Sequence, residues 1–215
     1  MINVFLADDH AVVRDGMCAL MDAEADIQVV GTAGDGRQTV RQVENTQPDV
    51  VVMDIAMPEL NGIEATRQIS ETCPAVKVII LSMHDSSEHV YQALKAGAKG
   101  YLLKDSAGKE VVSAVRAVSS GRRYLSDRIE ETVIEGYVFH KDVALGKTPL
   151  DKLSDRERQV LQLVVEGKSS TEISEILFLS PKTVDNYRSR LMQKLGMHDL
   201  RELVKFAIQH GLTAA

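Results

Sequence analysis

Short apolar runs alternate with amphipathic segments along the first half of the chain. The apolar runs lie at residues 4–6, 27–30, 50–53, 76–81 and 100–103. Three of them are nearly continuous in Val, Ile and Leu, which is typical of strands buried on both faces. The segments between them repeat apolar residues with helical spacing. This alternation predicts an α/β domain whose five-stranded parallel, doubly wound sheet carries helices on both faces.

The pattern changes near Ser126. The following segment contains glycine and proline breakers, with one possible helix through Ile129, Val133 and Ile134, and we interpret it as a linker. The rest of the chain is typical of an all-α domain of four helices. The predicted parts are a first domain at 1–125, a linker at 126–149 and a second domain at 150–215.

Composition adds a few limits. Hydrophobic residues make up 44% and charged residues 26% of the chain, as in ordinary globular proteins. No apolar run reaches the length of a membrane span and no signal peptide is recognisable, so we expect a cytoplasmic protein with no membrane partner. Cys18 and Cys73 are too isolated to predict a disulfide or a metal site. The net charge of −6 argues weakly against nucleic-acid binding, although a local basic face can be hidden in that average.

Charged and hydroxyl side chains stand at the ends of the predicted strands. Asp8 and Asp9 follow the first strand, and Asp54 follows the third. Ser82 ends the fourth strand, and Lys104 ends the fifth. Because parallel strands end at one edge of their sheet, we expect these five residues to gather there. Each alone has an ordinary explanation as a helix cap, a turn residue or a solvated charge, so the prediction depends on their conjunction.

This combination has a specific chemistry. Clustered carboxylates repel one another unless a cation neutralises them, and oxygen ligands with open positions suit Mg²⁺. An ammonium and a hydroxyl beside the metal would offset the charge of a transferred phosphoryl group. A carboxylate can itself be the nucleophile that forms an aspartyl phosphate.

The same residues resemble the receiver domain of two-component response regulators. The motifs are Asp8-Asp9, the run from Asp54 to Pro58 with Gly62, then Ser82, and the run from Gly100 to Lys104, all within the first 125 residues. The resemblance implies a flavodoxin-like fold in which a sensor histidine kinase phosphorylates Asp54. It further implies that Asp9 and Asp54 bind Mg²⁺ with the backbone carbonyl of Ala56, and that Asp8 assists through water.

Three residues would respond to phosphorylation. By the resemblance, Lys104 pairs with the phosphoryl oxygens, Ser82 moves to bond the phosphoryl group, and Tyr101 reorients into the vacated space. Tyr101 could also be a simple half-buried aromatic residue of its strand. Many receivers have proline after the lysine, often with a cis bond. Here Asp105 follows, and the sequence leaves the cis or trans state of this bond open.

Capping signals start three helices of the second domain. Ser154 to Glu157 and Ser169 to Glu172 are capping boxes, and Ser180 precedes a proline at the first helical position. A short turn joins the second of these helices to the third. This arrangement is typical of a helix-turn-helix motif.

The third helix separates an apolar stripe from a polar and basic side. The stripe consists of Val184, Tyr187, Leu191 and Leu195. Long polar side chains can read base edges while Lys and Arg hold phosphates, although a solvated amphipathic helix has the same pattern. The candidate DNA-binding residues are Lys182, Thr183, Asp185, Asn186, Arg188, Ser189, Arg190 and Lys194.

This region resembles the LuxR-type DNA-binding domain. The resemblance rests on the run from Leu153 to Leu161, on the run from Leu179 to Val184, and on Lys194-Leu195-Gly196. Joined to a receiver, it implies the NarL/FixJ family of response regulators, with a likeness to the GacA/UvrY branch in the run from Ser180 to Arg188.

The resemblance also implies base contacts by Asp185, Asn186 and Ser189. Many relatives carry Lys where Asp185 stands. An acid would instead accept a hydrogen bond from cytosine. The fourth helix has an apolar stripe from Leu200 to Ile208, which the family uses for dimerisation, although core packing explains it equally well.

Together these features predict a response regulator and not an enzyme. We expect phosphorylation of Asp54 to control homodimerisation and sequence-specific binding to double-stranded DNA, and so transcription. One alternative is a phosphorylation-independent DNA-binding regulator with a relic receiver, and another is a receiver that serves only protein interaction. A haloacid-dehalogenase-type phosphatase is disfavoured because its second catalytic acid would stand at Ala56.

Overall fold

The computed structural model describes residues 1–139, 149–210 and 212, apart from the side chains of 134–139. The chain divides into two compact units, Met1–Lys141 and Asp142–Ala215, and each is described here by itself. Within the part of the chain that the structure describes, no helix combines the length and apolar content needed to cross a bilayer.

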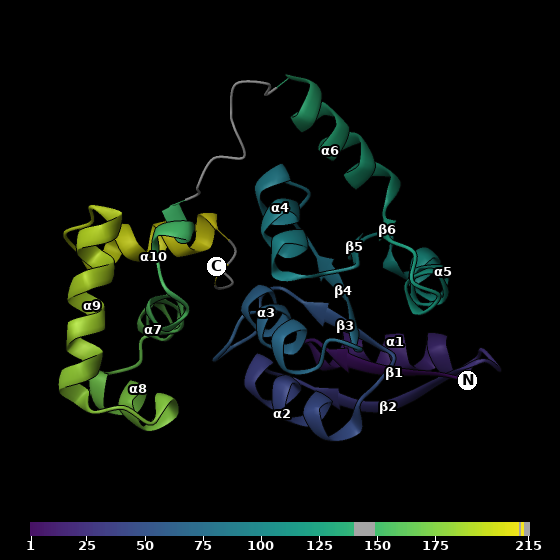
Figure 1. Cartoon of the computed structure of the whole chain (residues 1–215), viewed down its shortest axis with the longest axis horizontal. Helices are drawn as coiled ribbons and strands as arrows, with labels where there is room; N and C mark the ends of the chain where they lie inside the picture. Colours follow the sequence, from purple (N-terminus) through teal and green to yellow (C-terminus); the bar gives the residue numbers. More distant parts are fainter. Residues whose placement is uncertain (140–148, 211, 213–215) are drawn as a thin grey trace. The chain divides into compact units, whose positions relative to one another are not determined.

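A parallel sheet forms the centre of the first unit (Figure 1). Its strands are β1 (Ile2–Ala7), β2 (Ile27–Ala33), β3 (Val50–Asp54), β4 (Lys77–Ser82), β5 (Gly100–Leu103) and β6 (Tyr124–Leu125). The strand order is β2-β1-β3-β4-β5-β6. The expected five-stranded sheet is therefore extended by a sixth strand. Because β6 is only two residues long, no hydrophobic period marks it in the sequence.

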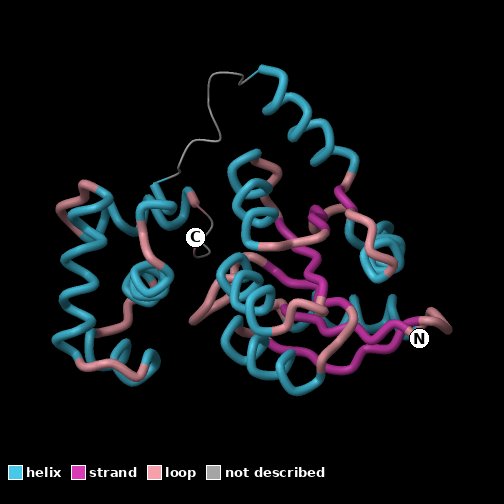
Figure 2. Tube along the Cα trace, viewed as in Figure 1, coloured by secondary structure: helices cyan, strands magenta, loops and turns pink. Residues whose placement is uncertain are grey.

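Helices cover both faces of this sheet, as Figure 2 shows. They are α1 (Ala11–Asp22), α2 (Gly36–Thr46), α3 (Gly62–Thr72), α4 (Ser87–Ala96) and α5 (Ala107–Ser119). One core contains Phe5, Val51 and Ile80 with residues of α2, α3 and α4. A second core, on the opposite face, contains Leu6 and Val52 with residues of α1 and α5. Alternate residues of β1 and β3 thus enter opposite cores, as strands buried on both faces require.

A sixth helix, α6 (Asp127–Phe139), occupies most of the described part of the predicted linker. Ile129 is fully buried in the first unit's core, and Val133 packs against that core. Arg128 Nη2 lies 2.8 Å from Asp85 Oδ2, and Arg128 Nη1 lies 3.3 Å from Asp105 Oδ2. The predicted linker helix is therefore joined to the receiver fold, and residues 140–148 lie outside the described residues.

The second unit is built from helices around one core. Its elements are the 3₁₀ helix η1 (Pro149–Lys152), α7 (Asp155–Val165), α8 (Ser170–Leu177), α9 (Pro181–Leu195) and α10 (Leu200–Gln209). Both predicted capping boxes are confirmed, and the Ser180 side chain accepts a hydrogen bond from the Thr183 backbone. The predicted apolar stripe of α9 faces inward, since Val184 and Leu191 are buried and Tyr187 packs on the same core.

Candidate functional site

The five predicted strand-end residues lie in the loops or last positions expected for them. β1 ends at Ala7, immediately before Asp8, and β3 ends at Asp54 itself. β4 ends at Ser82 and β5 ends one residue before Lys104. The strand order reverses direction between β1 and β3, so the carboxyl ends of these neighbouring strands lie where ligands bind in sheets of this kind. Asp8, Asp54 and Ser82 are buried, whereas Asp9 is exposed.

Lys104 bridges two of the carboxylates. Its Nζ lies 2.8 Å from Asp8 Oδ2 and 3.0 Å from Asp54 Oδ2. Only 13% of the Lys104 side chain is exposed, so these pairs are little screened by solvent. Burial lowers the pKa of Lys104, but the charge of Asp54 and the hydrogen bond to Asp8 outweigh it, and the pKa lies above its ordinary value. The ammonium therefore stays charged beside Asp54.

The surroundings of Asp54 raise the pKa of its carboxyl group. Burial raises the pKa of the Asp54 carboxyl, Lys104 lowers it, and the neighbouring charge of Asp8 raises it again, so the pKa is raised overall.

One ligand atom from each of Asp8, Asp9, Asp54 and His10 lies within 4.8 Å of the others. Carboxylate oxygens from three residues, one of them exposed, form a donor set that fits a hard divalent cation such as Mg²⁺. The residues present therefore fit the expected metal.

His10 is a member of this cluster that the sequence interpretation missed. Its Nδ1 lies 2.7 Å from Asp9 Oδ1 and 3.2 Å from Asp8 Oδ1, and its backbone N–H donates to Asp8 Oδ1 at 2.9 Å. The position directly after two strand-end acids was the available signal. His10 is the residue before α1, so its backbone orients the Asp8 carboxylate from the start of that helix.

Ser82 and Tyr101 meet at the backbone of His84. The His84 backbone N–H donates to Ser82 Oγ at 2.9 Å, and Tyr101 Oη donates to the His84 carbonyl at 2.7 Å. Tyr101 is fully buried, and burial raises its pKa to about 12. The loop after β4 is thus bonded to two of the three residues predicted to respond to phosphorylation.

Two further positions complete the first site. Ala56, whose backbone carbonyl was expected to bind Mg²⁺, lies in the loop after β3 and is partly exposed. The Lys104–Asp105 peptide bond, which the sequence left open, is trans.

The polar side of α9 is the candidate DNA-binding face. Its predicted contact residues are exposed or partly exposed, and Val184 and Leu191 are buried on the other side. At least four of the predicted DNA-binding residues have side-chain partners within the described part of this unit, namely Thr183, Asp185, Arg188 and Lys194. Lys194 Nζ lies 2.6 Å from the buried Glu157 Oε2 of α7, and Asp185 Oδ1 lies 2.6 Å from Ser170 Oγ of α8.

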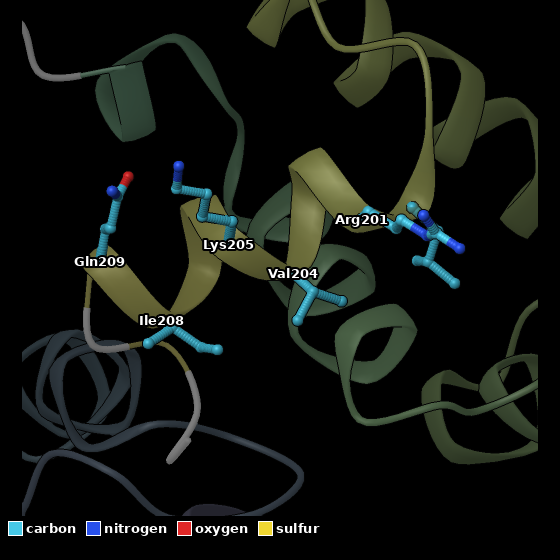
Figure 3. Close-up of a pocket in the computed structure, with 6 residues that line it drawn as sticks. Arg201, Val204, Lys205, Ile208 and Gln209 are labelled. Carbon is cyan, nitrogen blue, oxygen red and sulfur yellow. The ribbon is translucent and has the colours of Figure 1, made fainter.

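The apolar stripe of α10 is divided between core and surface. Leu203 and Ala207 are buried, whereas Leu200 is 50% and Ile208 is 38% exposed. The exposed part lies along an open groove shown in Figure 3. The groove is lined by Leu200, Arg201, Val204, Lys205, Ile208 and Gln209. Core packing therefore explains only part of the stripe.

Comparison with known proteins agrees with both halves of this description. Residues 4–116 match the family model described as response regulator receiver domain, and residues 151–207 match that of bacterial regulatory proteins of the luxR family. The chain is 41% identical to response regulator UvrY of Escherichia coli, over 100% of this chain and 97% of the relative. It is 37% identical to oxygen regulatory protein NreC of Staphylococcus haemolyticus, over 98% of this chain and 99% of the relative.

Solved structures give the same result. A LuxR-family two-component response regulator from Aurantimonas sp. SI85-9A1 is 38% identical, with a TM-score of 0.62, and the match covers 64% of this chain and 99% of that chain. The response regulator RcsB in a complex with DNA is 25% identical, with a TM-score of 0.59, over 97% of this chain and 98% of that chain.

These matches define a class of protein in which a phospho-receiver is joined to a LuxR-type DNA-binding domain. This chain belongs to the NarL/FixJ family of two-component response regulators, as the motifs predicted. The relatives are transcription regulators and not enzymes, and the full-length similarity to UvrY agrees with the expected branch. A receiver domain implies a histidine kinase as phosphodonor, and a LuxR-type domain binds DNA.

Proposed function

We propose that a histidine kinase phosphorylates Asp54, and that this modification controls homodimerisation and sequence-specific DNA binding by the second unit. The observation that carries the proposal is the largely buried Lys104 ammonium, held within 3.0 Å of both Asp8 and Asp54. Because the kinase and the DNA are both met in the cytoplasm, we expect the protein to act there.

The residues of the site divide the chemistry among them. An Asp54 carboxylate oxygen forms a bond to phosphorus while the bond from phosphorus to the leaving imidazole of the kinase breaks. Lys104 then offsets the charge of the transferred oxygens. Asp9, Asp54 and the Ala56 carbonyl would hold Mg²⁺, with Asp8 assisting through water. When bound, the cation would neutralise charge on the acids and on the phosphoryl group.

The loop after β4 would carry the response. In the present structure Ser82 Oγ accepts from the His84 backbone, and Tyr101 donates to the carbonyl of the same residue. If Ser82 turns to donate to a phosphoryl oxygen, the loop loses the hydrogen bond between the His84 backbone and Ser82. Tyr101 can then reorient into the vacated space. Phosphorylation then favours one of two existing receiver conformations, as a two-state switch requires.

The second unit would provide the output. The exposed side of α9 would enter the major groove, with Asp185, Asn186 and Ser189 facing bases. The positive side chains of Lys182, Arg188, Arg190 and Lys194, with the Thr183 hydroxyl, would lie near phosphates. The exposed apolar side of α10, with Leu200 and Ile208, would join two copies, so that two recognition helices reach half-sites one helical turn or a multiple apart.

The chemical step can be tested by intact mass after incubation with Mg²⁺ and acetyl phosphate. We expect wild type to gain the mass of one phosphoryl group, and Asp54→Asn to gain none because it lacks the nucleophile. Asp22→Asn, which changes an exposed acid at the end of α1, is the matched control and should react like wild type. Folded wild type that gains no mass, or Asp54→Asn that gains as much as wild type, would overturn the proposal.

A further inference from the structure

Ser170 connects the recognition helix to the helix before it. It is the first residue of α8, and both side-chain partners of its hydroxyl lie on α9. The hydroxyl donates to Asp185 Oδ1 at 2.6 Å and accepts from Arg188 Nη1 at 3.1 Å. A serine hydroxyl has one hydrogen and two lone pairs, so it can make both bonds at once.

Neither capping nor packing explains this arrangement. Ser169 caps α8, since its side chain accepts from the Glu172 backbone and Glu172 completes the capping box. The attachment of α8 to α9 comes from a buried apolar core that includes Ile173 and Val184. Ser170 is partly exposed and Asp185 is exposed, and hydrogen bonds in such positions add little stability. The three side chains are therefore ordered with little gain to the fold.

The charge of Asp185 makes its orientation important. It is the one acidic residue in the sequence of α9, on the side predicted to face DNA. A carboxylate directed at phosphates is repelled, whereas one directed at a base edge can accept from the cytosine amino group. The bond from Ser170 orients the carboxylate through Oδ1, and Oδ2 can still accept from a base. The same hydroxyl also accepts from the Arg188 guanidinium and so orients it.

We propose that Ser170 is a positioning residue for DNA readout, which fixes Asp185 and Arg188 on the recognition helix before DNA arrives. This inference rests on the proposed DNA-binding function and extends it to a residue outside the recognition helix. Binding normally loses the conformational entropy of each side chain that becomes ordered. A side chain that is already ordered avoids this loss, but only when the DNA sequence is bound by that same conformation. The expected effect of Ser170 is therefore on discrimination between sequences.

The test uses the full-length protein, incubated with acetyl phosphate and Mg²⁺, and a duplex selected from a random DNA library by the wild type in the same state. Affinities for this duplex and for its single-base-pair variants are measured at one salt concentration for wild type, Ser170→Ala, Ser170→Thr and Asp185→Asn. We expect Ser170→Ala to reduce discrimination by about two- to tenfold, at the base pairs where Asp185→Asn also reduces it. Ser170→Thr keeps the hydroxyl and should restore discrimination. Thr171→Ala, which removes the neighbouring exposed hydroxyl of α8, is the matched control and should behave like wild type.

Two results would overturn the inference. If Ser170→Ala discriminates as well as wild type, the hydroxyl does not position any group that recognises a base. Ser170→Ala that weakens every duplex equally would indicate a general structural role, which a lowered midpoint of thermal unfolding would also report. In both cases the wild type still selects a sequence, so the proposed function stands. A wild type that selects no sequence would overturn the proposed function and this inference together.

Discussion

At the scale of single residues, the proposed phospho-acceptor site depends on a close backbone approach at Gly62. A Cβ built on Gly62 would lie 1.9 Å from the backbone oxygen and 2.8 Å from the carbonyl carbon of Asp54. The Gly62 backbone N–H also donates to the Ile55 carbonyl at 2.8 Å. The start of α3 can therefore lie against the end of β3 only where no side chain intervenes.

Gly62→Ala is expected to displace the Asp54 backbone and to slow phosphorylation by about tenfold or more, because a small misplacement of a reacting group is costly. It should also lower the free energy of unfolding by about 1–3 kcal/mol through overpacking. The rate of mass gain from acetyl phosphate and urea unfolding measure the two effects. The matched control is Gly16→Ala in α1, where a Cβ meets nothing within 4 Å, and which should be neutral or slightly stabilising. Wild-type phosphorylation by Gly62→Ala would contradict this view of the site.

The sequence predicted which residues gather at the site, and it did not predict their local contacts. Asp8, Asp54 and Lys104 were found because parallel strands end at one edge, which is a property of topology. The contacts of His10 with two carboxylates and of Ser170 with α9 depend on side-chain rotamers and on how a loop turns. No hydrophobic period or motif spacing encodes such details.

At the scale of elements, α6 is the part that sequence patterns described least well. Its weak periodicity and nearby breakers suggested a linker, whereas among its described side chains Ile129 is buried in the core and Val133 packs against that core. The two-residue strand β6 was missed for a related reason. It is held by backbone pairing of Gly100 with Tyr124 and of Tyr101 with Leu125, which any short extended segment can make.

Ile129→Ala tests whether α6 is part of the receiver fold. Removing this fully buried side chain should lower the free energy of unfolding of the first unit by about 2–4 kcal/mol, measured by chemical denaturation. Amide hydrogen exchange of α6 should accelerate in the same variant. Thr132→Ala, one turn further along and partly exposed, is the control and should change stability by less than about 1 kcal/mol. Unchanged exchange in α6 would mean that the helix does not depend on this contact.

The pair formed by Lys194 and Glu157 joins α9 to α7 and has a definite pH dependence. Burial raises the pKa of Glu157, but the hydrogen bonds from Lys194 and Ser154 outweigh it and hold the pKa below its ordinary value of 4.5. A lowered carboxyl pKa stabilises the fold above pH 4.5, and this stability is lost as pH falls through the folded-state value.

Lys194→Met should therefore destabilise the second unit by about 1 kcal/mol at pH 7, and the difference from wild type should shrink below about pH 4. Urea unfolding at both pH values measures this. In a double-mutant cycle with Glu157→Gln, which keeps the capping box without the charge, the coupling should follow the same pH dependence. A coupling that is equally large at both pH values would not come from this ion pair.

At the scale of the whole molecule, the chain joins a receiver domain to a DNA-binding domain. The alternation of strand-like and helix-like hydrophobic patterns predicted the α/β unit, and the helix caps predicted the second unit. Both features depend only on residues that are close together in the sequence. The partners follow from the family that the motifs identify. The coupling between the two units depends on the free energies of at least two conformations, which no single pattern in the sequence encodes.

The most direct test of the central claim is the affinity of the full-length protein for its selected duplex, with and without acetyl phosphate and Mg²⁺, for wild type and Asp54→Asn. Fluorescence anisotropy with a labelled duplex gives the dissociation constant in each state. We predict that the phosphodonor tightens binding by the wild type about tenfold and leaves Asp54→Asn unchanged, as a typical coupling free energy between two sites would produce. Equal affinities of wild type in both states, or an equal response in Asp54→Asn, would contradict control of DNA binding by Asp54.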